Sequence, residues 1–278
     1  MSILPKKEVT KYYTKYKFLG TNSIKPDIDG IMRDLKKSAY VRGYYGASTA
    51  NMVSATHKDI FSKYKNVNLG KDVVIVATGP TLAKFNPIEN AVYIGVNRAY
   101  QYDKIKLDYI FMQSYHAVKP YIKDIYNLDI PKFFGEIILD NRPMSDLLIP
   151  EFEYLNAKAE KYYYTYYKEL SLFPVDITNS ALASVLTVAH SALHFALWTH
   201  PKRIYLAGCD TTAAPYWDGG AREEKYVKVS DFVNNTAIDG YKKFKYFADT
   251  YYPDVEIISV NPVGLKGIFT DIYTEGEN

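Results

Sequence analysis

The chain has 278 residues, of which 47% are hydrophobic and 23% are charged. This balance is typical of a globular protein and excludes an intrinsically disordered one. A net charge of +3 is too small to indicate a nucleic-acid partner, and the apolar runs are too short and too interrupted for a membrane span. Cys209 is the only cysteine and the first residues lack the pattern of a secretory signal, so we expect a cytoplasmic protein without disulfides.

Tyrosine is unusually frequent, with 28 residues that often stand beside lysine, as in KYYTKYKF and AEKYYYTYYKEL. Aromatic rings interleaved with basic residues could stack on nucleotide bases or lie at an anionic membrane surface. The clusters are scattered along the chain, which favours a simpler interpretation. We expect most of these tyrosines to fill half-buried positions on strands and helix edges.

Residues 1–70 are polar and contain two helical patterns but no apolar strand. One pattern begins near Pro26 and Asp27, and the other follows Ser48 and Thr49. We therefore expect an N-terminal helical extension over 1–70. The DxD sequence at 27–29 resembles a metal–nucleotide motif of sugar transferases, but no apolar strand precedes it, so we give it little weight.

From residue 71 to 278, short apolar runs alternate with helical stretches. The expected strands are 73–77, 92–96, 109–112, 133–138, 204–207 and 257–260, and the expected helices are 180–199 and about 240–250. This alternation predicts an α/β domain with a Rossmann-like, doubly wound and mostly parallel sheet, covered by helices on both faces. Such sheets bind ligands beyond the carboxyl ends of their strands.

Polar residues follow several of these strands. Gly79, Pro80 and Thr81 follow the first strand, where a glycine allows close backbone approach to a ligand. Asn97 and Arg98 follow the second strand and offer amide donors beside a fixed cation. Gln113, Ser114 and His116 continue the series after the third strand. An ordinary turn or cap explains each motif equally well when it is taken alone.

Two later segments complete the set of candidates. Thr178, Asn179 and Ser180 precede the expected helix over 180–199 and could form an anion site at its N-terminus, or only cap it. Asp210 follows the strand over 204–207, and the long polar stretch over 211–239 suits a mobile lid.

His190 and His194 are four residues apart on the expected apolar helix, a spacing that could present two metal ligands on one face. Neither an adjacent glutamate of the HExxH type nor a third ligand can be identified. We expect both imidazoles to be packed in the core.

Taken together, these motifs resemble the bacterial sialyltransferases of glycosyltransferase family 42 and the related GPSL-motif proteins, which include motility accessory factors. The resemblance covers about residues 72–270. It rests on ATGPT at 77–81, Asn97-Arg98, ITNS at 177–180, IYLAGCD at 204–210, a lid tyrosine near Tyr216, and VNP at 260–262. It implies a GT-A-like variant of the sialyltransferase type.

The resemblance also implies an activity, namely inverting transfer of a sugar from a CMP-type donor to a glycan or glycolipid hydroxyl, without a metal or other cofactor. The nucleotide would contact Gly79, Thr81, Asn97, Tyr216 and the residues of 178–180. This chain departs from the family at the catalytic histidine of the lid, whose position falls near Ala237. Asp231 and Asp239 are the nearest carboxylates, and either could serve as the general base.

Two other functions remain open. A pterin pyrophosphokinase-like enzyme would need Mg²⁺-binding carboxylates at the strand ends, where only Asp210 stands out. A non-catalytic nucleotide-binding assembly protein would explain the missing histidine. A peripheral contact with the inner membrane surface and a homo-oligomer are compatible with the sequence, whereas a nucleic-acid partner is not expected.

Overall fold

The computed structural model describes residues 28–113, 115, 119–139, 142–143, 149–166, 173–222 and 224–274. The chain divides into two units, Met1–Ser48 and Thr49–Asn278, each of which is described by itself. The predicted residues Ser114 and His116 lie outside the described residues. Within the described part of the chain, no helix is both long and apolar enough to cross a membrane.

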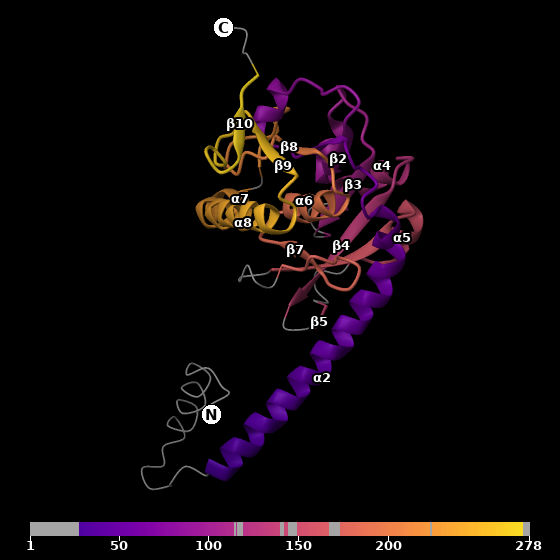
Figure 1. The fold of residues 1–278 in the computed structure, drawn as a ribbon, viewed down its shortest axis with the longest axis vertical. Helices are drawn as coiled ribbons and strands as arrows, with labels where there is room; N and C mark the ends of the chain where they lie inside the picture. Colours follow the sequence, from indigo (N-terminus) through magenta and orange to yellow (C-terminus); the bar gives the residue numbers. More distant parts are fainter. Residues whose placement is uncertain are drawn as a thin grey trace. The chain divides into compact units, whose positions relative to one another are not determined.

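The second unit contains a ten-stranded sheet whose main path is parallel throughout (Figure 1). Its order is β10-β9-β8-β1-β2-β3-β4-β6-β7, and the short β5 pairs antiparallel with β4. The strands are β1 (Asp72–Val76), β2 (Val92–Val96), β3 (Tyr109–Gln113), β4 (Lys132–Leu139), β5 (Arg142–Pro143), β6 (Glu160–Tyr166), β7 (Leu182–Ser184), β8 (Arg203–Ala207), β9 (Glu256–Val260) and β10 (Thr270–Ile272).

The strand order reverses between β1 and β8. From β1 the chain builds the sheet outward through β2, β3, β4, β6 and β7, and then returns to the other side of β1 with β8, β9 and β10. Such a reversal opens a crevice beyond the carboxyl ends of the two central strands, because their connections leave toward opposite faces. The topology therefore places the candidate site above β1 and β8.

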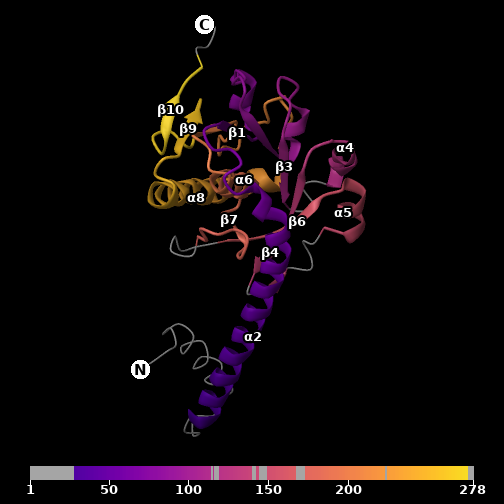
Figure 2. The same ribbon diagram turned by 45° about the vertical axis from the view of Figure 1, so that its right-hand side comes forward.

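Helices cover both faces of the sheet, as the two ribbon views show (Figures 1 and 2). On one face, α6 (Val188–Trp198) and α8 (Ser230–Tyr251) pack with strand residues such as Val73 and Ile75. On the other face, strand residues such as Val74 and Val76 pack with η2 (Pro80–Lys84), η3 (Asn97–Gln101), α4 (Ile122–Tyr126) and α5 (Glu151–Ala157). Alternation along β1 thus supplies both cores, as a strand buried on two faces requires.

This architecture confirms the predicted α/β, doubly wound sheet with helices on both faces. All six predicted strands are present, with bounds that shift by no more than one residue. The prediction of one helix over 180–199 is wrong, because Leu182–Ser184 form β7 and α6 begins only at Val188. Continuous apolar character over these residues serves a buried strand and a buried helix equally well.

The N-terminal prediction also needs correction. The two helical patterns are one continuous helix, α2 (Ile28–Phe61), followed by η1 (Ser62–Tyr64). The division between the two units falls within this helix, after Ser48, and not at residue 70. In the second unit, the Phe61 carbonyl accepts a hydrogen bond from Trp198 Nε1 at 2.9 Å.

Three buried histidines join backbone segments of the second unit, and the expectation that His190 and His194 are core residues is confirmed. His190 Nδ1 accepts from the Val185 amide at 3.1 Å, and His194 Nδ1 accepts from the Ala183 amide at 2.9 Å. His57 Nε2 accepts from the Tyr163 amide at 2.8 Å. Burial lowers the pKa of His190 to about 3 and the pKa values of His57 and His194 to about 4, so all three are neutral at pH 7.

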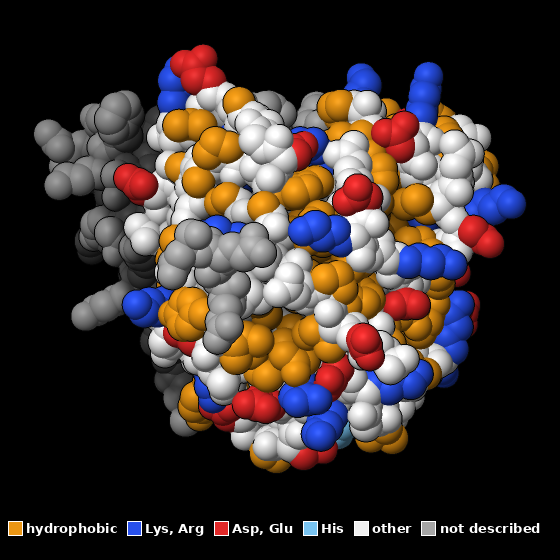
Figure 3. Space-filling view, turned by 90° about the horizontal axis from the view of Figure 1, so that it is seen from above, with side chains coloured by type: hydrophobic (Ala, Val, Ile, Leu, Met, Phe, Trp, Pro, Cys, Tyr) orange, Lys and Arg blue, Asp and Glu red, His pale blue; other side chains and the backbone are white. Residues whose placement is uncertain are grey.

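The surface seen from above mixes both signs of charge with apolar side chains (Figure 3). Lysine and arginine side chains stand among aspartates and glutamates on this face. The mixing agrees with the small net charge of +3.

Candidate functional site

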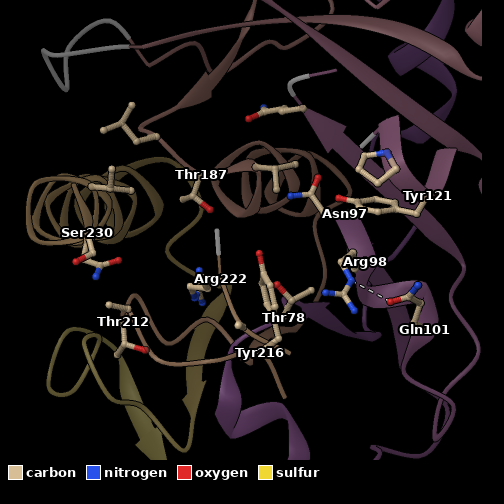
Figure 4. A pocket seen from close by; sticks show the side chains of 18 of the residues that line it. Thr78, Asn97, Arg98, Gln101, Tyr121, Thr187, Thr212, Tyr216, Arg222 and Ser230 are labelled. Carbon is tan, nitrogen blue, oxygen red and sulfur yellow. Dashed lines mark hydrogen bonds between the residues drawn. The ribbon is translucent and has the colours of Figure 1, made fainter. Parts of the chain in front are cut away.

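A cavity of about 710 Å³ lies beyond the carboxyl ends of the central strands (Figure 4). Its walls come from the segments that follow β1, β2, β3 and β8, from β6, and from the first turns of α6 and α8. The lining residues are Thr78, Asn97, Arg98, Gln101, Gln113, Pro120, Tyr121, Tyr164, Tyr166, Leu186, Thr187, Val188, Thr212, Ala213, Tyr216, Ala221, Arg222, Ser230, Val233 and Asn234. Four of the predicted residues, Asn97, Arg98, Gln113 and Tyr216, are among them.

Two arginines carry the formal charge of the cavity wall, and both pack against Tyr216. The Arg98 guanidinium carbon lies 5.0 Å from the centre of the Tyr216 ring, and that of Arg222 lies 4.9 Å from it. Figure 4 shows the two arginines on opposite sides of this ring. Cation–π contacts at these distances hold each guanidinium in place. Arg98 also pairs with Asp218 at 2.8 Å, so it is chiefly Arg222 that gives this end of the cavity the net positive charge that suits an anion.

The N-terminus of α6 also opens on the cavity, through Leu186, Thr187 and Val188. Thr187 is the N-cap, and its hydroxyl accepts a hydrogen bond from the Ala189 amide at 3.3 Å. The N-terminus of the apolar helix thus lines the cavity, but Thr187 stands there in place of the predicted residues Thr178, Asn179 and Ser180. The helix dipole adds partial positive charge to that of the arginines.

Two oxygens in the cavity wall are buried without a hydrogen-bond partner among the described residues, Asn97 Oδ1 and Thr212 Oγ1. Unsatisfied buried acceptors are uncommon and call for an explanation. Asn97 also has a left-handed backbone, with φ of 50°, as do Leu186 at 61° and Thr211 at 49°. Strained residues of this kind cluster at ligand sites, and here they follow β2, β7 and β8.

The crevice between β1 and β8 is closed by a separate set of contacts. Asp210 Oδ2 accepts from the Thr81 amide at 2.8 Å, and Asp210 Oδ1 accepts from the Thr81 hydroxyl. A Cβ atom on Gly79 would meet this carboxylate and lie 2.6 Å from the Gly208 carbonyl oxygen. Burial raises the pKa of Asp210 against the opposing hydrogen bonds from Thr81.

Gly79, Pro80, Thr81 and Asp210, all predicted to contact a nucleotide, therefore do not line the cavity. Pro80 begins η2, Thr81 donates to Asp210, and the Gly79 amide donates to the Gly208 carbonyl at 2.9 Å. Their observed contacts join the two halves of the sheet directly beside the cavity.

Gln113 lines the cavity, but its amide is engaged by the protein. Its Nε2 donates to the Tyr162 hydroxyl at 3.0 Å and to the Ser191 hydroxyl at 2.7 Å. Its Oε1 accepts from the Ser184 hydroxyl at 3.3 Å, which ties β3 to the bend before α6. These contacts indicate a positioning role for Gln113 that sets the course of the wall at 184–188.

Thr178, Asn179 and Ser180 form a turn between Asp176 and β7. The Asp176 carboxylate accepts from the Thr178 amide at 2.8 Å and from the Asn179 side chain at 2.9 Å. The Ser180 carbonyl lies 3.0 Å from His57 Nδ1. This turn packs on α2 within the second unit and does not line the cavity.

The two predicted general bases lie on the exposed faces of α8, outside the cavity. Ser230, Val233 and Asn234 line the cavity at the i, i+3 and i+4 positions of one helical face. Asp239 follows Ser230 by about two and a half turns, so it faces the opposite way, and it pairs with Lys243 at 2.9 Å. Asp231 is exposed and does not line the cavity either.

Part of the cavity wall is aromatic, since Tyr121, Tyr164 and Tyr166 line it together with Pro120, and Figure 4 shows Tyr121 beside Asn97 and Arg98. Tyr164 and Tyr166 belong to β6, which sequence reasoning did not recognise as a strand. Their ring centres are 6.2 Å apart, and burial raises the pKa of both hydroxyls. The cluster EKYYYTY is therefore a strand of the central sheet that carries tyrosine both in the core and in the cavity wall.

Sequence reasoning also missed Thr187, Thr212 and Arg222. Arg222 and Thr212 fall in the segment predicted as a lid, where no periodic pattern marks individual side chains. Among the described residues, no three His, Cys, Asp or Glu side chains gather in a group that could hold a metal ion.

Neither a protein-family model nor a curated protein sequence matches the chain. Among solved structures, it is similar to the sialyltransferase CstII from Campylobacter jejuni in complex with the substrate analogue CMP-3FNeuAc, at 14% identity and a TM-score of 0.39, covering 68% of this chain and 80% of that chain. It is also similar to the sialyltransferase CST-II in complex with a trisaccharide acceptor and CMP, at 15% identity and a TM-score of 0.39, with the same coverage of both chains. A tyrosine-to-phenylalanine variant of the sialyltransferase CST-II in complex with CMP matches at 15% identity and a TM-score of 0.36, covering 67% of this chain and 80% of that chain. Identities and TM-scores this low support no conclusion about the fold or the function of this chain.

Proposed function

We propose that the protein is a glycosyltransferase that takes a sugar from a CMP-type or similar nucleotide donor. The observation that carries the proposal is the positively charged end of the cavity, where Arg98, Arg222 and the N-terminus of α6 converge. Backbone amides and guanidinium groups are the donors that proteins use for phosphate. The order of the sequence motifs over 72–270 supports the choice of donor.

In this function the protein acts by stabilising charge on the leaving group. When the bond between the sugar and the phosphate breaks, negative charge accumulates on the nucleotide phosphate. Fixed cationic groups that are already oriented by Tyr216 and by helix packing stabilise that charge without reorganisation. Arg98 and Arg222 would carry this role, and the unpaired oxygens of Asn97 and Thr212 would accept hydroxyl or amino groups of the donor.

The aromatic part of the cavity wall suits the acceptor. A tyrosine combines an apolar ring with a polar tip, so it can pack against one face of a sugar and hydrogen-bond its rim. Tyr164 and Tyr166, which line the cavity on β6, would hold a glycan acceptor beside the donor. Asp231 and Asp239 have no direct role in this arrangement, because both lie outside the cavity wall.

The test is turnover with CMP-sialic acid and, for comparison, UDP- and GDP-sugars, with an acceptor panel and with or without EDTA. We expect release of CMP that depends on an acceptor and continues in EDTA, and a loss of at least tenfold in Arg222→Gln. Binding of CMP without turnover on any acceptor would favour the non-catalytic nucleotide-binding protein. Dependence on Mg²⁺ would favour the pyrophosphokinase-like reaction.

A further inference from the structure

Arg98 is held by a carboxylate from the loop that follows β8. Arg98 Nη2 lies 2.8 Å from Asp218 Oδ2, with the two side chains 25% and 36% exposed. Arg98 Nε donates to Gln101 Oε1 at 3.0 Å, and the guanidinium also lies 5.7 Å from the Trp217 ring. One cation at the carboxyl end of β2 is thus engaged by a segment that follows β8, on the other side of the β1–β8 crevice.

The loop that carries Asp218 is organised by its own hydrogen bonds. The Tyr216 amide donates to the Gly220 carbonyl at 2.9 Å, and the Gly219 amide donates to the Tyr216 carbonyl at 3.0 Å. Asp218 Oδ1 accepts from the Gly220 amide at 2.9 Å. One carboxylate oxygen therefore stabilises the turn, while the other faces Arg98.

Arg222 is held by a backbone carbonyl and not by a carboxylate. Its Nε donates to the Ala214 carbonyl at 2.7 Å, which fixes the guanidinium against Tyr216. Within the described residues it forms no ion pair. The two cations of the cavity differ accordingly, since Arg222 is positioned by a neutral carbonyl and Arg98 is neutralised by a carboxylate.

We propose that Asp218 competes with the anionic group of the ligand for Arg98, so that binding of a phosphate or carboxylate replaces an internal ion pair. This inference rests on the proposed function only for the nature of the ligand. A partly exposed ion pair is worth about 0.2–1 kcal/mol. A ligand that displaces Asp218 loses that amount of affinity, which corresponds to a Kd higher by about 1.4-fold to fivefold.

The competition predicts that removal of a charged residue beside the cavity strengthens binding. Asp218→Asn keeps an oxygen that can accept from the Gly220 amide but removes the negative charge from Arg98. By calorimetric titration with CMP at low ionic strength, we expect a Kd lower than that of the wild type by about 1.4-fold to fivefold. Asp249→Asn is the matched control, because Asp249 pairs with Lys245 on an exposed part of α8 and its loss changes the net charge equally.

A double-mutant cycle and a second probe complete the test. In an Arg98→Gln background, Asp218→Asn should no longer lower the Kd for CMP. Cytidine, which lacks the phosphate, should bind the wild type and Asp218→Asn with the same Kd. An unchanged or higher Kd for CMP in Asp218→Asn, or a gain that persists without Arg98, would overturn the competition. Inorganic phosphate separates this inference from the proposed function. If Asp218→Asn binds phosphate more tightly than the wild type does, but neither protein prefers CMP to phosphate, the competition is supported and the nucleotide donor is rejected. If the wild type and Asp218→Asn bind CMP with the same Kd, the competition is rejected and the nucleotide donor is supported.

Discussion

Acidification should destabilise the protein through its three buried histidines, His57, His190 and His194. Each accepts a hydrogen bond from a backbone amide, so its accepting nitrogen cannot take a proton without breaking that bond. Their pKa values are lowered from 6.5 to between about 3 and about 4, chiefly by burial. The unfolded chain therefore binds more protons below pH 6.5, and stability is full above that pH and falls as the pH decreases toward 4.

The size of the effect follows from the pKa differences. One pKa unit corresponds to about 1.4 kcal/mol, so at pH 5 each histidine lowers the free energy of unfolding by about 2 kcal/mol relative to pH 7.5. The three together give an upper limit of about 6 kcal/mol, which is comparable to the whole stability of many domains.

The assay is urea denaturation between pH 7.5 and pH 5, followed by the fluorescence of the buried Trp198. We expect the pH dependence of the unfolding free energy to decrease by about a third in His57→Gln, which removes one of three comparable contributions. His200→Gln is the control for loss of one imidazole, since His200 lies near the surface beside Asp254. A flat stability profile down to pH 5, or an unaltered slope in His57→Gln, would refute the reasoning.

Three further predictions concern the site. Asp231→Asn and Asp239→Asn should leave the Kd for CMP and the rate of transfer within twofold of the wild type, because neither side chain lines the cavity. A large loss of turnover in a folded variant would instead support that carboxylate as the general base. Gly79→Ala should lower the free energy of unfolding by about 1–3 kcal/mol in urea titrations, since its Cβ would meet Asp210 and the Gly208 carbonyl, and wild-type stability would show that the crevice can widen. Thr187→Ala should cost about 1 kcal/mol of stability through the lost cap and also raise the Kd for CMP, whereas an unchanged Kd would remove the α6 terminus from the site.

The sheet could be predicted from the sequence because most of its strands are short apolar runs buried on both faces. Val73, Ile75 and their neighbours need no knowledge of tertiary contacts to be recognised. The strand over 160–166 was missed because tyrosine and lysine mask its burial, which depends on pairing with β4. The three residues of β7 were missed because only two small polar residues, Ser184 and Thr187, interrupt the apolar run that leads into α6.

The residues of the cavity wall also fall into two groups, those that the sequence predicted and those that it did not. Asn97 and Arg98 follow β2, and Gln113 ends β3. All three reach the cavity because parallel strands end at one edge of the sheet. Thr212 and Arg222 belong to a loop whose course is set by long-range contacts such as the pair between Arg98 and Asp218, 120 positions apart in the sequence. No local pattern specifies such a pair.

The central claim is that Arg98 and Arg222 form an anion-binding end of a nucleotide site. The most direct measurement is the thermal unfolding midpoint with and without CMP, in EDTA, for the wild type, the double variant Arg98→Gln/Arg222→Gln and the control Asp249→Asn. At a concentration 100 times its Kd, CMP should stabilise the wild type and the control by about 2.7 kcal/mol, which raises the midpoint by several degrees, and should leave the double variant unchanged. An absence of stabilisation of the wild type by CMP, or an equal stabilisation of the double variant, would contradict the account.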